Sequence, residues 1–241
     1  MKKLLVLIAF FIAGLAQAQE ERHPIDEVSY RLLQKSWKTS DMMEAEGVAY
    51  DGWDQLLNIV YGELRKVMKP ATFAALKEAQ RAWIKFRDAE FENIYALYYQ
   101  EMEGTMWRPV AIGQRALIVQ QRTQFLLRQY NHLSSPWEPD PKPLKGTWQV
   151  TGEHPEAKIE IRRDLTSVWH NMGDTEYQVR FYRISKGCGE DDSANKGKAI
   201  HFITMGSADD NQCYYIENHT KESMELRSAV TEEVLKLKLE Q

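Results

Sequence analysis

The sequence predicts a two-domain α+β protein, in which an N-terminal antiparallel helical bundle is followed by a small antiparallel β-barrel. Three observations predict this fold class. Apolar residues recur at helical spacing up to about residue 133, and they alternate with a period of two after residue 145. Between these regions, residues 134–144 hold four of the eight prolines of the 241-residue chain. Such a segment is neither helix nor central strand, so we place an extended linker there.

The first 18 residues have the pattern of a secretory signal peptide. Two lysines precede an apolar run from Leu4 to Leu15, and Ala16-Gln17-Ala18 forms a small-X-small cleavage site. No cysteine follows the run, so we expect no lipid anchor. No other stretch approaches the ~18 apolar residues that span a membrane. These features predict a periplasmic or secreted protein without a membrane span.

The mature chain is acidic. Without Lys2 and Lys3, 29 of the 31 basic residues remain against 35 acidic ones, which gives a formal net charge of −6. A chain of this charge lacks the basic surface that binds phosphate backbones. Nucleic acid is therefore not an expected partner.

The helical domain is placed at residues 19–133. Asp41 followed by Glu44 suggests a capped helix start, while Gly47 and Gly52 weaken that helix and favour a kink near Gly52. Helices are expected over Pro24–Trp37, from Asp41 to Val67, over Pro70–Gly104 and from Pro109 to Asn131. Short connections make these helices antiparallel neighbours.

The third of these helices is expected to be the centre of the bundle. Pro70 suits a first helical position and Gly104 suits a left-handed helix end, and the segment would be about 50 Å long. Its apolar stripe contains Gln80, Trp83, Ile84, Arg87, Phe91, Ile94 and Tyr95. Arg87 lies within that stripe, so it needs a carboxylate inside the bundle or a position at its edge, because an unpaired buried charge is costly.

The same region resembles a known family. The segments that carry the resemblance are Leu56-Leu57-Asn58-Ile59-Val60-Tyr61-Gly62-Glu63-Leu64, Leu76-Lys77-Glu78-Ala79-Gln80-Arg81-Ala82-Trp83 and Phe86-Arg87-Asp88-Ala89. Together they are similar to the LprI-type lysozyme-inhibitor N-terminal domain, over roughly residues 41–130. The resemblance implies a small exported helical domain without catalytic residues. Family members commonly carry two helical cysteines, whereas this chain has Phe91 at one of those positions and no cysteine before Cys188.

Two interpretations of the motif residues Asn58, Gln80, Trp83, Arg87 and Asp88 remain open. In the structural one, Trp83 packs in the core, Arg87 pairs with an acidic residue such as Glu63 on the facing helix, and Asp88 is exposed. In the functional one, Arg87 and its neighbours face a cleft and recognise a ligand or partner.

The end of the third helix is rich in aromatic and sulfur-containing side chains. These are Tyr95, Tyr98, Tyr99, Met102, Met106 and Trp107. Such residues anchor protein interfaces, but at helical spacing they also form cores or the contact with a second domain.

The second domain, residues 145–241, is expected to contain about eight short strands. They are predicted at residues 146–150, 158–162, 167–170, 176–184, 198–205, 214–217, 223–227 and 233–239. Eight antiparallel strands without an intervening helix avoid exposed edges by closing into a barrel. The opening Gly146-Thr147-Trp148 resembles the first strand of lipocalin-like domains, which implies a lipocalin-like meander.

Cys188 and Cys213 are the only two cysteines. Since an exported protein meets an oxidising compartment, we predict that they form a disulfide; two buried free thiols are the alternative.

No catalytic or cofactor motif is recognisable, so the sequence predicts a non-enzyme without a cofactor. Four histidines of the second domain, His154, His170, His201 and His219, either converge on a metal or lie solvated at the surface, and we favour the latter. The acidic segments Glu190-Asp191-Asp192 and Asp209-Asp210 lack the pattern of a known calcium loop, so a solvated acidic face is favoured over calcium binding. No metal site is therefore predicted.

Two functions follow from the sequence. The first is a non-enzymatic envelope binding protein whose helical domain inhibits a lysozyme or captures another envelope protein. The second is a carrier or sensor that holds a small apolar ligand in the barrel.

Overall fold

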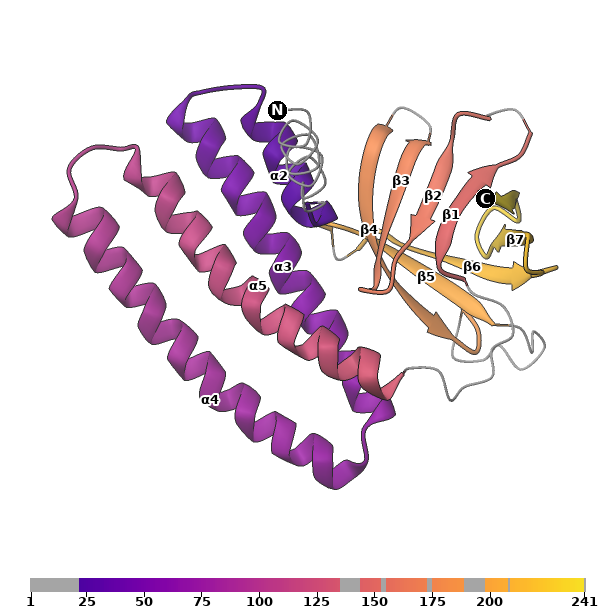
Figure 1. Cartoon of the computed structure of the whole chain (residues 1–241), viewed down its shortest axis with the longest axis horizontal. Coiled ribbons are helices and arrows are strands. Elements are labelled where there is room, and N and C mark those ends of the chain that lie inside the picture. Colours follow the sequence, from indigo (N-terminus) through magenta and orange to yellow (C-terminus); the bar gives the residue numbers. More distant parts are fainter. Residues whose placement is uncertain are drawn as a thin grey trace, which may run out of the picture.

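The computed structural model describes residues 22–134, 144–152, 155–172, 175–188, 198–207 and 209–240. A helical unit comes first in the chain and a β-barrel follows it, with the two units in contact along one side of the barrel (Figure 1). This two-domain α+β architecture confirms the predicted fold class. The predicted signal peptide and nearly all of the proline-rich linker lie outside the described residues.

The helical unit contains four α-helices in its described part. They are α2 (Pro24–Leu33), α3 (Thr39–Val67), α4 (Pro70–Tyr95) and α5 (Trp107–Leu133), and a π-helix, η1 (Ala96–Glu101), continues α4. Proline occupies the first turn of α2 and of α4, where its missing N–H group costs nothing. Gly104 has a φ of +93°, as expected of the residue that turns the chain between η1 and α5.

Helices α3 and α5, rather than α4, form the centre of this unit. They contribute the buried alanines Ala45, Ala49, Ala111 and Ala116, which allow the two helices to approach closely. Helix α4 is the outermost one (Figure 1), and only Leu76 and Ile94 in it are buried. The prediction of a central α4 is therefore wrong. Ile84 and Tyr95, which were expected in the core, are 38% and 45% exposed.

The barrel is closed and has eight antiparallel strands, each paired with its neighbour in sequence. The strands are β1 (Gly146–Val150), β2 (Lys158–Ile161), β3 (Thr166–Met172), β4 (Thr175–Ser185), β5 (Ala199–Thr204), β6 (Asn211–Glu217), β7 (Ser223–Ser228) and β8 (Val234–Leu239). The pairing of Trp148 with Leu239 joins β1 to β8 and closes the barrel. Leu144, the last residue of the predicted linker, is buried, and its carbonyl oxygen accepts a hydrogen bond of 2.7 Å from Trp148 Nε1.

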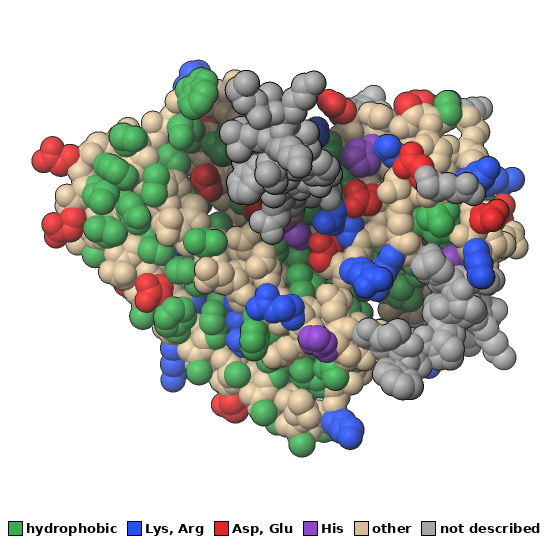
Figure 2. All heavy atoms as spheres, viewed as in Figure 1, with side chains coloured by type: hydrophobic (Ala, Val, Ile, Leu, Met, Phe, Trp, Pro, Cys, Tyr) green, Lys and Arg blue, Asp and Glu red, His purple; other side chains and the backbone are tan. Residues whose placement is uncertain are grey.

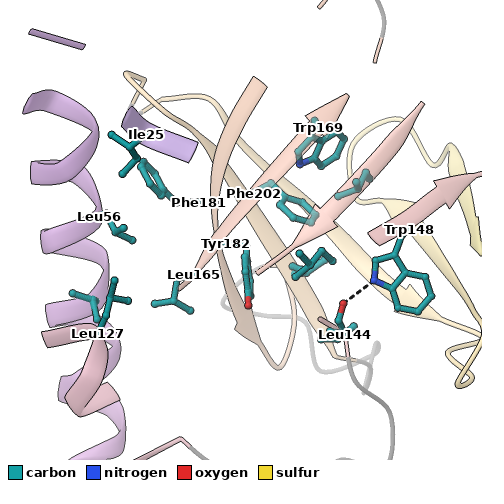
Figure 3. Close-up of a cluster of buried hydrophobic side chains, with 14 of the residues drawn as sticks. Ile25, Leu56, Leu127, Leu144, Trp148, Leu165, Trp169, Phe181, Tyr182 and Phe202 are labelled. Carbon is teal, nitrogen blue, oxygen red and sulfur yellow. Dashed lines mark hydrogen bonds between the residues drawn. The ribbon is translucent and has the colours of Figure 1, made fainter. Parts of the chain in front are cut away.

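Strands β3 and β4 are buried on both faces over residues 166–169 and 179–182. Trp169 pairs with Ile159 across the strands and lies in the barrel interior, where its ring contacts that of Phe202 at 5.0 Å. Phe181 projects from the opposite face of β4 toward Ile25 of α2 (Figure 3). Because the helical unit covers this outer face, burial there does not alternate as it does in a half-exposed strand.

The contact between the two units is formed by α2 and α3 with β4 and the β5–β6 hairpin. A Cβ atom added to Gly52 would lie 2.8 Å from Met205 Sδ and 2.9 Å from Ile25 Cγ2, so glycine permits this close approach. Gln55 Oε1 accepts a hydrogen bond of 2.9 Å from the Gly206 amide. Helix α3 is continuous through Gly52. That glycine therefore has a packing role, and the aromatic end of the third predicted helix, residues 95–107, is not the interdomain contact.

Asp164, between β2 and β3, links the barrel to the start of α2. Its carboxylate lies 3.2 Å from His23 Nε2 and also accepts a hydrogen bond from the Thr166 amide. Burial by itself raises the pKa of Asp164, but the hydrogen bonds and charges of His23, Thr166 and Arg162 outweigh it and lower the pKa to about 2.

Ionised Asp164 should therefore stabilise the protein above pH 4, and this contribution should be lost as the pH falls through about 2. We expect Asp164→Asn to lower the free energy of unfolding by about 2 kcal/mol at pH 7, and by progressively less below pH 4. Urea unfolding of both proteins between pH 7 and pH 3 measures the difference. A difference that does not change with pH would contradict the assignment.

Candidate partner-binding site on the helical domain

Three motif residues of α4, Gln80, Trp83 and Arg87, are partly buried on its inner side, where they form a polar layer rather than a core, whereas Asp88 is exposed as expected. Arg87 is partly exposed and donates hydrogen bonds to the neighbouring Asp88, from Nε at 2.9 Å and from Nη2 at 2.7 Å. Glu63, the expected partner of Arg87, instead accepts a hydrogen bond from Lys66. The predicted Arg87–Glu63 pair is thus wrong, because the ring contacts Tyr50–Phe91 and Tyr61–Phe73 place Glu63 beside the start of α4, several turns from Arg87.

Arginines of α5 complete this layer. Arg122 Nε donates a 2.9 Å hydrogen bond to Gln80 Oε1, and the Arg122 guanidinium lies 5.8 Å from the centre of the Trp83 ring. The Arg87 guanidinium lies 5.5 Å from the same ring. Trp83 is therefore held between two cations, at the distance at which cation–π attraction operates.

A second contact of the same kind lies further along α4. The Arg115 guanidinium is 5.3 Å from the centre of the Phe91 ring, which in turn contacts the ring of Tyr50 on α3. Burial raises the pKa of Tyr50, and the nearby Asp54 carboxylate raises it further. Within the described part of the chain, Arg115 Nε and Arg122 Nη2 are buried without a hydrogen-bond acceptor.

The α5 arginines are not among the residues singled out from the sequence. Arg108, Arg115 and Arg122 are spaced seven residues apart, and residues 107–133 contain no Asp or Glu. This spacing places them along one side of a helix, which was the signal available. Asn58 does not join the layer, since its side chain is exposed and donates to the carbonyl oxygen and the carboxylate of Asp54.

The geometry predicts different energetic roles for the two arginines that flank Trp83. We expect Arg87→Ala to lower the free energy of unfolding by at most about 1 kcal/mol, because its ion pair is exposed. Arg122→Ala should cost about 1–3 kcal/mol, since it leaves Gln80 without its hydrogen bond and removes the contact with Trp83. Chemical denaturation of both variants measures this order. A cost above 3 kcal/mol for Arg87→Ala would place that side chain in the core after all.

Exposed apolar side chains gather at the end of the helical unit that is furthest from the barrel (Figure 2). We call the group formed by Tyr95, Leu97, Met106 and Val110 the distal patch; each of these side chains is at least 37% exposed, and Met106 is 64% exposed. Tyr95 stacks on Tyr99 with ring centres 5.1 Å apart, which orders one edge of the patch. Glu101 and Glu103 adjoin it in the chain and are exposed. A surface of this composition is typical of a protein interface.

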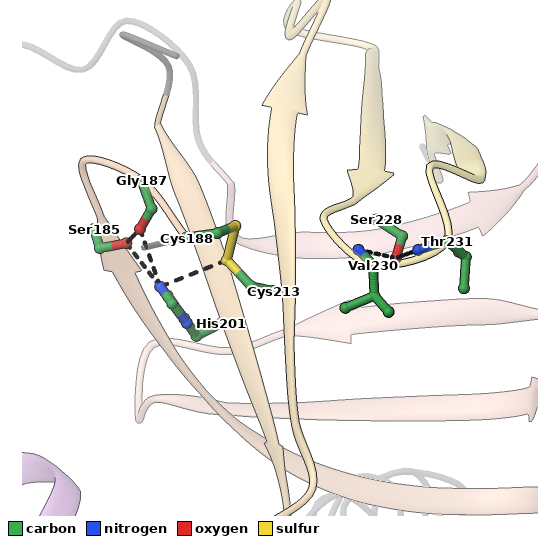
Figure 4. Close-up of a disulfide and its surroundings, with 8 residues drawn as sticks. All are labelled: Ser185, Gly187, Cys188, His201, Cys213, Ser228, Val230 and Thr231. Carbon is green, nitrogen blue, oxygen red and sulfur yellow. Dashed lines mark hydrogen bonds between the residues drawn. A yellow bond between two sulfur atoms is a disulfide. The ribbon is translucent and has the colours of Figure 1, made fainter. Parts of the chain in front are cut away.

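The barrel contains the predicted disulfide between Cys188 and Cys213 (Figure 4). The two cysteines are 25 residues apart, and closing a loop of this length contributes roughly 3–4 kcal/mol on the chain-entropy model. His201 packs beside the bond, with Nε2 2.8 Å from Ser185 Oγ and 3.6 Å from Cys213 Sγ. Burial lowers the pKa of His201, and the charge of Arg183 lowers it further.

The interior of the barrel is filled by side chains. Trp148, Trp169 and Phe202 are fully buried there, together with aliphatic residues of β2, β7 and β8. The groups considered for metal binding are not gathered at one place: the described residues contain no cluster of three potential His, Cys, Asp or Glu ligands. His154 and Glu190-Asp191-Asp192 lie outside the described residues.

The fold thus defines a two-domain protein, a helical module followed by a closed eight-stranded barrel. Residues 33–126 match the family model described as Lysozyme inhibitor LprI, a segment that runs from the end of α2 to the last part of α5. No curated protein and no solved structure matches the chain significantly. Among the described helices, none combines the length and the apolar character that crossing a membrane requires.

Proposed function

We propose that this protein is an exported, non-enzymatic inhibitor that binds a lysozyme-type muramidase through its helical domain. The observation that carries the proposal is the match of residues 33–126 to the lysozyme-inhibitor family, because this segment includes α3, α4 and most of α5. An inhibitor acts by occupying a surface rather than by turnover, so it needs exposed contact residues and no catalytic group.

The distal patch is the part of the helical domain best suited to make that contact. Its tyrosine, leucine and methionine side chains supply apolar area, and Met106 and Tyr95 are already exposed in the free protein. Glu101 and Glu103 beside the patch, and the acidic mature chain, would attract a basic muramidase. Charge attraction of this kind accelerates association and weakens as salt screens it over about 10 Å.

The proposal is tested by titrating the purified mature protein against lysozyme on a peptidoglycan substrate at low and at physiological salt. We expect inhibition that is stronger at low salt. Met106→Asp should raise the half-inhibitory concentration at least about tenfold, because a charge would be buried at the centre of the contact.

Val230→Asp is the matched control. Val230 is an exposed apolar residue of the barrel, so the same charge placed there should leave inhibition unchanged. Absence of inhibition at tens of micromolar in both salt conditions would refute the proposal for that target. If Met106→Asp and Val230→Asp weakened inhibition equally, the distal patch would not be the contact surface.

A further inference from the structure

A groove runs between helix α2 and strand β4, on the side of the molecule where the two units meet. Its wider part has a volume of about 590 Å³ and includes Val28 and Leu32 among its lining residues. Its narrower part has a volume of about 180 Å³ and extends to Arg162 and His170. Arg31 and Tyr177 line both parts, so the two parts adjoin at this pair of residues. The wider part alone has the size of a small-molecule site.

The polar groups of this groove are mainly hydrogen-bond donors. Arg22 and Arg31 both donate to a single carboxylate, that of Glu27, at 3.1 Å and 2.9 Å. Each guanidinium has five N–H donors, so most of them are left for other acceptors. Tyr177 adds its hydroxyl.

The charges in the groove leave a small positive excess. Among the described lining residues, the cations Arg22, Arg31, Lys35 and Arg162 face the carboxylates of Glu27, Glu160 and Glu176. Two of these carboxylates already accept hydrogen bonds from arginines. Burial and the Glu27 carboxylate raise the pKa of Tyr177 to about 12, so its hydroxyl keeps its proton near neutral pH. An anion entering the groove would therefore meet unused donors.

The groove also has an apolar wall, which is formed by α2 and by the Tyr177 ring. Val28 and Leu32 lie one turn apart on the same face of α2 and line the wide part of the groove. The Arg31 guanidinium stacks over the Tyr177 ring, 4.2 Å from its centre, which holds the cation at the junction of the two parts.

We propose that this groove binds a small amphipathic anion, with a carboxylate or phosphate held by Arg31 and the Tyr177 hydroxyl and an apolar body against Val28 and Leu32. The site is separate from the distal patch. Ligand binding in the groove is therefore independent of whether the helical domain inhibits a muramidase.

Isothermal titration calorimetry of the full mature chain tests the proposal with three probes that share one alkyl chain: octanoate, octyl phosphate and octanol. We expect saturable binding of at least one of the two anions, and at least about tenfold weaker binding of the alcohol. Arg31→Gln should weaken binding of the anion about tenfold or more, because a charge-assisted hydrogen bond is lost. Tyr177→Phe, which keeps the ring, should weaken it severalfold.

Arg81→Gln is the matched control, since Arg81 is an exposed arginine of α4 in an ion pair with Glu78. It should bind the anions as the unchanged protein does. Circular dichroism spectra and melting temperatures show that the variants are folded. The proposal is overturned if the unchanged protein binds neither anion saturably, if octanol binds as well as the anions, or if Arg31→Gln and Arg81→Gln have the same effect. The tighter of the two anions identifies the headgroup.

Discussion

Replacing Trp53 by alanine is expected to lower the free energy of unfolding by about 3–5 kcal/mol. Trp53 is 1% exposed and lies where α2, α3 and α5 meet. Its Nε1 donates a 2.7 Å hydrogen bond to Asp26 Oδ1, and its ring contacts that of His23 at 4.3 Å. The substitution would leave a cavity and would also release the residue that places His23 beside the barrel.

The Trp53→Phe variant separates the contribution of ring packing from that of the hydrogen bond to Asp26. Phenylalanine keeps most of the ring but cannot donate to Asp26, whose other oxygen still accepts a 3.0 Å hydrogen bond from Gln120. We therefore expect a smaller cost of about 1–2 kcal/mol. Urea unfolding followed by circular dichroism measures both variants. A cost below 1 kcal/mol for Trp53→Ala would show that the three helices do not depend on this side chain.

Replacing two glycines of α3 by alanine should change the stability of the protein in opposite directions. At Gly62 a new Cβ would have no atom within 4 Å, so Gly62→Ala should stabilise the protein by about 0.5–1 kcal/mol through helix propensity. At Gly52 the new Cβ would be 2.8 Å from Met205 Sδ and 2.9 Å from Ile25 Cγ2. We expect Gly52→Ala to destabilise by about 1–3 kcal/mol, because the contact between the units must open.

The difference between the two variants, about 1.5–4 kcal/mol, is the quantity to measure, because each serves as the control for the other. Melting temperatures and chemical denaturation both report it. If Gly52→Ala were as stabilising as Gly62→Ala, the close approach of α3 to the β5–β6 hairpin would not exist in solution.

The strands of the barrel follow closely from sequence. Period-two alternation and turn residues placed all eight strands within a few residues of their observed bounds, and β1 was placed at Gly146–Val150 without error. Closure of the barrel also followed, since eight short antiparallel strands need it to avoid free edges. Local patterns are sufficient here because each strand pairs with its neighbour in the chain.

The helices were located by the same kind of local signal, but their arrangement was not. The apolar stripe of α4 showed that it has an inner face, and it did not show how deeply that face would be buried. The small side chains of α3 and α5 decided the outcome, because they let those two helices pack closely and left α4 outside. Of the two positions left open for Arg87, the structure shows the one at the edge of the bundle, where the arginine pairs with Asp88.

The residues of the candidate sites were likewise only partly predictable from the sequence. The motif residues Gln80, Trp83, Arg87 and Asp88 were singled out from sequence, whereas Arg122, which contacts Gln80 and Trp83, comes from α5, further along the chain. The groove could not be predicted at all, since Arg31 and Tyr177 are brought together only by the contact of the two units.

The sequence alone determined the fold class, the order and type of the elements, the disulfide pair and the family motif. These properties depend on periodicity, on turn residues and on local composition, which are written along the chain. Only the tertiary structure decided which helix is central, where the two units touch and which cations face the groove. Those properties depend on side-chain volumes and on contacts between residues distant in sequence, and periodicity in one segment carries no information about the shape of another.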